Sequence, residues 1–408
     1  MNRNPAFRFA SARLVPVLLT AFLALAAIGR AQDAAPMQPV EIRSACESAT
    51  KPVVLATSGK GWLETRAGNL VLHVAGTPYE MGYQHGVLLR PQIQSLVARL
   101  YVAAAAQALT AKEESPFARL EKAYARCLPY IPKDVLDEMR GLAEGAQLPL
   151  ERLRTVNMIP ELFHCSGFAM WGKATNDGAL YHGRILDYAM ELGYHNFAVL
   201  IVGRPEGKHA FINVGYTGFL GSVTGTNDQG ISFGEMGGGG VGQWDGMPMA
   251  FLLRKGLEEA DSLEEGLAIF RETPRTCEYY YVISDAKKKD ARGLACTPEK
   301  FLVLRPGEKH PALPAQVAYP DTVLMSGEGR FQLLAERVGT VHGRIDGPTG
   351  LMLMRRPVAM KSAIHTALFA PERGKLWIAN AVGTTPASEC PYTEYDIKEL
   401  FEAKPPKQ

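Results

Sequence analysis

The sequence lacks an excess of charge of either sign, because 44 Lys and Arg residues stand against 42 Asp and Glu residues in a chain of 408. That balance argues against a basic nucleic-acid surface and against an electrostatic funnel for acidic substrates. A composition typical of disorder is also missing, since 47% of the residues are hydrophobic and 21% are charged. The length suits one large domain or two smaller ones.

Cysteine is scarce, and no metal-binding or phosphate-binding motif is present. The six cysteines are too few for a disulfide framework, and no CxxC or Cys/His spacing of a zinc site occurs. Their pairing stays open. The run Gly237–Gly240 lacks the Lys-Ser/Thr pair of a P-loop and is interpreted as a flexible turn. We therefore expect no metal, no cofactor and no nucleic-acid partner.

Long hydrophobic runs are missing except near the N-terminus, where Val15–Ile28 is apolar and follows three arginines. A membrane span needs ~20 apolar residues, and this run is shorter. Residues 1–31 are therefore predicted to be a signal peptide that is cleaved after Ala31, with an uncleaved N-terminal anchor as the alternative. The mature protein is expected in the periplasm or outside the cell, with no membrane span after removal of the leader.

The pattern of apolar residues in the rest of the chain changes near residue 165. Residues 32–50 are rich in Ala, Pro, Gln and Ser and are expected to form a flexible lead-in. Apolar residues then recur at helical spacing, so residues 51–164 are predicted to be mainly helical. Residues 165–408 hold short apolar runs between turn residues, typical of antiparallel strands, and two helices, the second starting with the capping box Ser262–Glu265. Both parts together predict one α+β domain with antiparallel sheets against helices.

Cys165 is the most informative candidate residue, because it lies where the helical part ends and the strand-rich part begins. Arg184 and Asp187 follow in a predicted strand with apolar neighbours, where a charge without a partner would be costly. A pair of these two charges that faces a site is the functional interpretation. A buried cysteine beside a structural Arg–Asp pair is the alternative that the residues alone leave open.

The motifs around Cys165 resemble those of the N-terminal-nucleophile hydrolases, and most closely the penicillin acyltransferase-like branch, which is related to the choloylglycine hydrolases. The resemblance covers about residues 65–400 and implies a four-layer αββα sandwich. The motifs that carry it are, in chain order, Met81–Gly86, Gly141–Gly145, Asn157, Cys165–Gly167, Asn176–Gly178, His182–Asp187, Thr226–Gly230, Gly246–Pro248, Arg254, Pro274–Arg275 and Pro391–Tyr392.

The resemblance implies that the chain cuts itself between His164 and Cys165. The freed α-amine has an ordinary pKa of about 7.7–8.0, against about 8.5 for a thiol, so it can serve as the base for its own thiol. The fragments 51–164 and 165–408 would then be a small and a large subunit of one domain. Asp187 would orient the amine of Cys165, and Arg184 would favour the thiolate.

The resemblance implies one further catalytic role, and the sequence departs from the family pattern at two positions. The resemblance gives Asn227 the role of donor to the oxyanion, while a turn residue is the alternative. Relatives carry a second catalytic asparagine, but the corresponding stretch here has Ser326, which is the candidate replacement. Relatives often have glycine before the nucleophile, where this chain has the bulkier His164.

These patterns predict an exported cysteine amidohydrolase or acyltransferase that cleaves a linear N-acyl amide through a thioester on Cys165. Its expected partners are a small N-acyl substrate and its own cleaved N-terminal fragment. Coenzyme A thioesters should be scarce outside the cell, which favours hydrolysis over transfer. The alternatives are a choloylglycine-type or acyl-lactone hydrolase and a catalytically weakened relative that acts as a binding protein.

Overall fold

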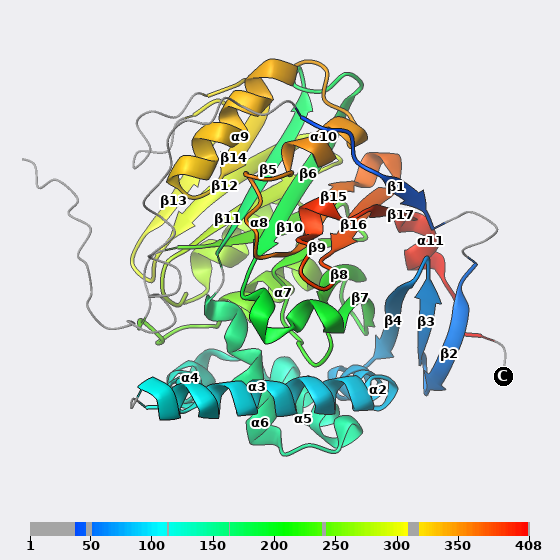
Figure 1. The fold of residues 1–408 in the computed structure, drawn as a ribbon, viewed down its shortest axis with the longest axis vertical. Coiled ribbons are helices and arrows are strands. Elements are labelled where there is room, and N and C mark those ends of the chain that lie inside the picture. The colour runs from blue at the N-terminus through cyan, green and yellow to red at the C-terminus, as the bar shows by residue number, and fades with distance from the viewer. Residues whose placement is uncertain are drawn as a thin grey trace, which may run out of the picture.

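The computed structural model describes residues 37–45, 51–111, 114–162, 164–238, 242–308 and 318–406. The predicted signal peptide, residues 1–31, lies outside this part of the chain. Within it, two sheets stack face to face (Figure 1). The seven-stranded sheet has the order β1 (Ile42–Ser44), β17 (Tyr392–Asp396), β16 (Lys375–Asn380), β15 (Ala363–Ala370), β6 (Gly178–Asp187), β5 (His164–Gly172) and β14 (Thr322–Met325).

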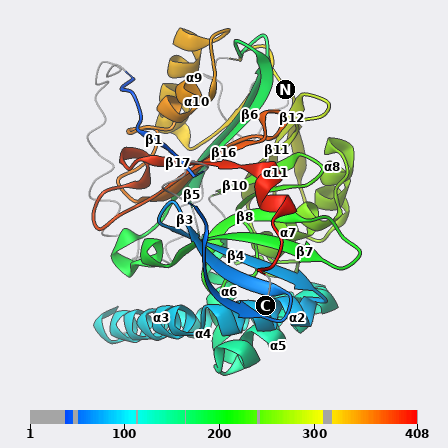
Figure 2. The same cartoon turned by 90° about the vertical axis from the view of Figure 1, so that its right-hand side faces the viewer.

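The second sheet has ten strands in the described residues, and it mixes the two halves of the sequence. Its order is β13 (Phe301–Leu304), β12 (Asp290–Cys296), β11 (Tyr279–Asp285), β10 (Ile231–Gly237), β9 (Thr224–Asn227), β8 (Phe211–Tyr216), β7 (Ala198–Pro205), β4 (Asn69–Gly76), β3 (Gly61–Arg66) and β2 (Val53–Ser58). Strands β4 and β7 run parallel side by side (Figure 2), as do β1 and β17, and the other pairs are antiparallel.

Close backbone approaches at glycines show the order of the layers. A Cβ on Gly234 of β10 would lie 3.0 Å from the side chain of Arg184 on β6, so these two sheets face each other directly. Helices α9 (Glu328–Val341) and α10 (Gly347–Leu353) cover the outside of the seven-stranded sheet. Helices α7 (Met249–Glu259) and α8 (Leu263–Glu272) cover the outside of the other one. The α+β class and the four-layer αββα order are confirmed.

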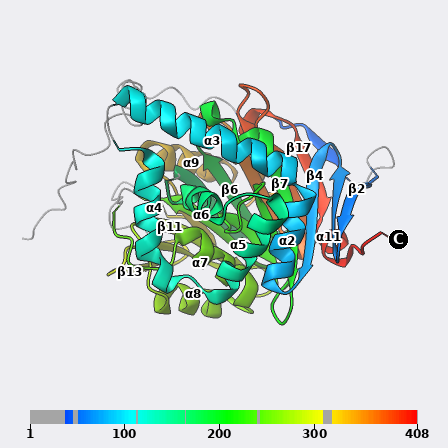
Figure 3. The same cartoon turned by 90° about the horizontal axis from the view of Figure 1, so that it is seen from below.

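The N-terminal helices form a base below the sandwich (Figures 1 and 3). They are α2 (Pro78–Leu88), α3 (Arg90–Ala111), α4 (Pro116–Cys127), α5 (Lys133–Ala146) and α6 (Leu150–Asn157). Helices α2 and α5 pack backbone to backbone, since a Cβ on Gly82 would overlap the carbonyl of Glu138 and one on Gly141 would overlap that of Tyr79. The glycine motifs at 82–86 and 141–145 therefore serve helix packing. No helix among the described residues is long and apolar enough to cross a membrane.

The segment 51–164 is mainly helical as predicted, but strands β2, β3 and β4 precede its helices. Two other expectations about local structure need correction. Strand β1 pairs with β17, so the lead-in 32–50 contains an ordered strand at residues 42–44. In the capping box, Ser262 accepts from the Glu265 N–H as predicted, at 3.3 Å, but the Glu265 carboxylate binds the N–H of Asp261 instead of that of Ser262.

Candidate active site

Cys165 is the second residue of β5 and is 3% exposed. A short 3-10 turn, Ile159–Leu162, connects helix α6 to this strand, so the nucleophile candidate does lie at the junction of the two structure types. Cys165 pairs with Leu186 of β6 in an antiparallel register. This pairing places the thiol between the two sheets.

Arg184 contacts the sulfur directly. Its Nη2 donates to the Sγ of Cys165 at 2.9 Å, and the same nitrogen pairs with the Oε2 of Glu235 at 3.2 Å. The Nε also donates to the carbonyl of Glu235 at 3.1 Å. Both charged side chains are fully buried. Since Glu235 belongs to β10, this ion pair joins the two sheets behind the thiol.

Asp187, at the end of the same strand as Arg184, belongs to a second ion pair, which is partly buried. Its carboxylate contacts Arg330 of α9 and accepts from the N–H of Met360 at 2.9 Å. Arg330 also donates to the carbonyl of Cys165 at 3.3 Å. Asp187 lies opposite His164 in the strand register, and Arg330 connects its carboxylate to the carbonyl of Cys165.

The electrostatics of the intact chain keep the thiol neutral. Burial raises the pKa of Cys165 well above its ordinary value, and the charges of Glu235 and Asp187 raise it further. Arg184 opposes this rise, but its charge is shared with Glu235. Burial likewise raises the pKa of Asp187, against the influence of Arg330. Two cations and two carboxylates thus balance each other around a neutral thiol.

A buried histidine extends the site. The Nε2 of His365, on β15, lies 3.3 Å from Arg184 and 3.0 Å from the hydroxyl of Thr224, and its Nδ1 lies 3.0 Å from the hydroxyl of Tyr216. Burial and the nearby guanidinium hold the pKa of His365 well below its ordinary value. Because a guanidinium can only donate, the neutral ring accepts at Nε2 and donates from Nδ1 to Tyr216.

Asn227 lies at the end of β9 and is not placed at the thiol by any of its contacts. Its amide donates to the carbonyls of Leu257 and Ala260 at 3.2 and 2.8 Å, and its oxygen accepts from the N–H groups of Gln229 and Ile231. All these bonds stabilise a turn and the end of α7. The oxyanion role of Asn227 stays a prediction that these contacts do not support.

Ser326 contacts the residue after the nucleophile. Its Oγ lies 2.6 Å from the Oγ of Ser166, because β14 pairs with β5. Successive side chains of a strand point to opposite faces, so this bond lies on the face opposite the Cys165 thiol. The role of Ser326 as a second oxyanion contact stays a prediction that this contact does not support. The structure brings Cys165, Arg184 and Asp187 together, and it places the backbone of His164 at the start of the same strand as Cys165.

Three residues of the site were missed in the sequence. Glu235 has the signal that singled out Arg184, a charge inside a buried apolar strand. His365 lies in a predicted strand but shows no motif. Arg330 belongs to a helix, and the sequence does not indicate that its side chain faces Cys165. Their roles appear only when the two sheets and α9 are assembled.

An apolar cavity of about 20 Å³ lies beside this group. Tyr216 borders it and connects it to His365. The remaining lining residues come from the turn before β5, from the segment around β8 and from α7 and β15: Pro160, Tyr194, Asn213, Val214, Gly215, Phe219, Gly221, Val223, Ala250 and Ile364.

The site thus holds a buried cysteine, an arginine bonded to its sulfur, and an aspartate that pairs with the arginine at its carbonyl. Residues 174–300 match the model of the acyl-coenzyme A:6-aminopenicillanic acid acyl-transferase family. This match confirms the resemblance that the sequence motifs indicated. The matched segment holds Arg184, Asp187 and Glu235.

Several proteins are similar to this chain. Protein dcd1B of Dictyostelium discoideum is 28% identical over 274 residues, which cover 59% of this chain and 54% of that protein. The N-acylethanolamine-hydrolyzing acid amidase of Mus musculus is 24% identical over 171 residues, covering 40% and 46%. Penicillin V acylase from Agrobacterium tumefaciens aligns in structure over 58% of this chain and 87% of that one, with 11% identity and a TM-score of 0.39. The chain spans about half the length of the curated relatives it matches.

Proposed function

We propose that this protein is an exported cysteine amidohydrolase that cleaves itself before Cys165 and then hydrolyses a linear N-acyl amide. The contact of 2.9 Å between Arg184 and the Cys165 sulfur carries this proposal. A guanidinium that donates to a buried sulfur stabilises a thiolate once one forms. The amidase named among the similar proteins supports the choice of an N-acyl amide over other acyl compounds.

The first step activates the chain. The Cys165 sulfur attacks the carbonyl carbon of His164, the bond from that carbon to the Cys165 nitrogen breaks, and the thiol proton moves to the released amine. Water then hydrolyses the thioester and leaves a carboxylate on His164. Arg330, which donates to the Cys165 carbonyl, and Asp187, opposite His164, hold the strand on either side of this bond.

The second step uses the new α-amine as the base. It takes the thiol proton, and the thiolate attacks the substrate carbonyl, which releases an amine and leaves a thioester on Cys165. Water hydrolyses this thioester to a carboxylic acid. Arg184 stabilises the thiolate and Asp187 orients the ammonium group. Ser326, on the strand beside β5, is the proposed donor to the developing oxyanion.

The fragments would stay together after the cut. The N-terminal fragment supplies β2, β3 and β4 to the ten-stranded sheet, where β4 pairs with β7 along its length. It also supplies β1 to the seven-stranded sheet. Separation would break two sheets and expose the buried faces of α2 to α6. The cleaved N-terminal fragment is thus proposed as a permanent subunit.

A binding protein is the second candidate, because the contacts of Asn227 are all structural and residue 326 is a serine. Incubation with a panel of linear N-acyl amides, followed by measurement of the released acid, separates the two. The amidohydrolase predicts release by the wild type and none by Cys165→Ala. Tight binding of an amide without release by the processed wild type would instead favour the binding protein.

A further inference from the structure

The segment between β8 and β9, residues 217–221 (the 217–221 loop), is held by side chains of the N-terminal helices. His85 of α2 accepts from the N–H of Gly218 at 3.0 Å. Asn157 of α6 accepts from the N–H of Leu220 at 2.8 Å and donates to the carbonyl of Gly218 at 2.9 Å. Both side chains are almost fully buried. Three backbone groups of one loop therefore depend on residues that precede the predicted cleavage site.

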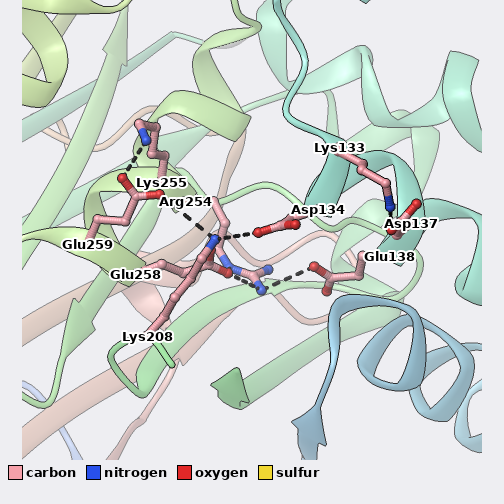
Figure 4. Close-up of polar contacts among 9 residues, drawn as sticks. All are labelled: Lys133, Asp134, Asp137, Glu138, Lys208, Arg254, Lys255, Glu258 and Glu259. Atoms are coloured by element: carbon pink, nitrogen blue, oxygen red, sulfur yellow. Dashed lines mark hydrogen bonds and ion pairs between the residues drawn. The ribbon is translucent and has the colours of Figure 1, made fainter. Parts of the chain in front are cut away.

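Arg254 of α7 also binds the loop. It donates to the carbonyl of Leu220 at 2.8 Å, and it is fixed by Glu258 at 2.8 Å and by Glu138 of α5 at 3.3 Å (Figure 4). Its guanidinium also lies over the ring of Phe211, 3.9 Å from the centroid. Since Glu138 belongs to the N-terminal helices, this contact with the loop is connected to them as well.

The bond from Gly218 to His85 persists across the physiological pH range. Burial and the charge of Arg254 hold the pKa of His85 down at about 3, so its ring stays neutral and keeps its acceptor. Backbone groups that are buried and lose their partners destabilise the conformation that buries them. Removal of either side chain therefore leaves a backbone group of the loop without its hydrogen-bond partner. The loop must then move to give that group a new partner.

The loop forms part of the wall of the apolar cavity. Phe219 and Gly221 line it together with Pro160, which lies in the turn that leads to the predicted cleavage site. Tyr216, just before the loop, borders the same cavity and contacts His365, the neighbour of Arg184. A cavity of about 20 Å³ has room for little more than one water molecule. Its size depends on where the loop places Phe219.

We propose that His85 and Asn157 are positioning residues that, through the 217–221 loop, determine which acyl groups the cavity beside Tyr216 accepts. The proposal rests on the function proposed above. The small apolar cavity has room only for the methyl end of a short, uncharged acyl group, and a longer chain requires the loop to move. The N-terminal fragment would thus set the specificity of a site whose reacting groups all lie in the C-terminal fragment.

The test compares His85→Ala and Asn157→Leu with Gln84→Leu as the matched control. Gln84 is buried in the same helix as His85 and binds both backbone groups of one residue, Ala75, away from the loop. The readout is kcat/KM for amides of one amine with acyl chains from acetyl to dodecanoyl. Both loop variants should raise the ratio of long to short chains by about tenfold, mainly through KM. His85→Gln, which keeps an acceptor, should restore the wild-type ratio.

Hydrogen exchange at Gly218 and Leu220 provides a readout that needs no activity. Exchange should accelerate at Gly218 in His85→Ala and at Leu220 in Asn157→Leu, and at neither in the control. Folded loop variants with unchanged exchange and an unchanged chain-length ratio would overturn the proposal.

If the wild type cleaves no amide, the proposed function fails by itself. The positioning role is then decided by the alkylation rates of Cys165 with N-alkyl chloroacetamides of the same chain lengths. If the ratio of the alkylation rates with long and short reagents rises in both loop variants, the positioning role is supported. An unchanged ratio would contradict it.

Discussion

Two buried arginines, each paired with glutamate, stand in different electrostatic surroundings. Arg184 shares its charge between Glu235 and the Cys165 sulfur, and Asp187 is balanced by Arg330. Arg254 instead faces two carboxylates, those of Glu138 and Glu258.

Arg254 belongs to a wider network of charged residues (the helix network), in which Lys208 contacts the carboxylates of Glu258, Asp134 and Glu259, and Lys255 also pairs with Glu259 (Figure 4). The group around Cys165 has equal numbers of cations and carboxylates, whereas the helix network has four carboxylates against three cations.

The difference shows where each group can take up a proton. In the helix network, burial raises the pKa of Glu138 to about 7, the charge of Glu258 adds to this rise, and Arg254 and Lys208 oppose it. In the balanced group the thiol is the neutral member, and a further cation or the loss of a carboxylate would favour its thiolate. The α-amine released by cleavage would be that cation, which explains why a closed, balanced site could be inactive before the cut.

The largest expected effect comes from removal of the cation at the sulfur. Arg184→Met together with Glu235→Gln keeps the site neutral and should lower amide hydrolysis by about 10²–10³, because the thiolate loses its stabilising charge. Steady-state hydrolysis by processed protein measures this. Lys208→Gln, which removes a cation from the other network, is the control, and an equal loss there would indicate a general effect of buried charge.

Removal of the Glu235 carboxylate alone should make the Cys165 thiol more reactive. In Glu235→Gln, Arg184 interacts with the sulfur without a competing anion, so the pKa of Cys165 should fall. Alkylation of Cys165 by iodoacetamide at pH 7, followed by intact mass, should accelerate by about tenfold for each unit of that fall. Glu258→Gln should leave the rate unchanged. A slower reaction in Glu235→Gln would refute the account of the balanced group.

The helix network predicts a dependence of stability on pH. Glu138 has a pKa of about 7 in the folded chain against 4.5 in its reference state. The folded chain therefore holds a proton that the unfolded chain loses, and stability should fall as the pH rises from 4.5 to 7, by at most ~3 kcal/mol. Urea unfolding at several pH values, compared with Glu138→Gln, should show a flatter profile in the variant. Parallel profiles would show that Glu138 does not titrate in this range.

The smallest effect is expected at the edge of that network. Asp134 binds Lys208 at 3.0 Å, but its side chain is 51% exposed. Asp134→Asn should therefore change the free energy of unfolding by less than about 1 kcal/mol. A larger loss in urea unfolding would mean that the exposed residues belong to the same cooperative unit as Glu138 and Arg254.

The sequence was sufficient for the part of the site that lies within one stretch of chain. Cys165, Arg184 and Asp187 come from two adjacent strands, so their proximity follows from a hairpin. Glu235, Arg330 and His365 reach the same place from the opposite sheet, a covering helix and a late strand, and no local pattern encodes that. The fold class followed from periodicity, but β2 to β4 did not, because β2 is largely exposed and β3 largely buried, so neither alternates clearly.

Self-cleavage before Cys165 is the central claim, and the intact mass of protein produced without residues 1–31 tests it most directly. The wild type should separate into two masses under denaturing conditions, the larger one starting at Cys165, while Cys165→Ala stays whole. A wild type that remains a single chain alongside the variant, after prolonged incubation over a range of pH, would contradict the claim.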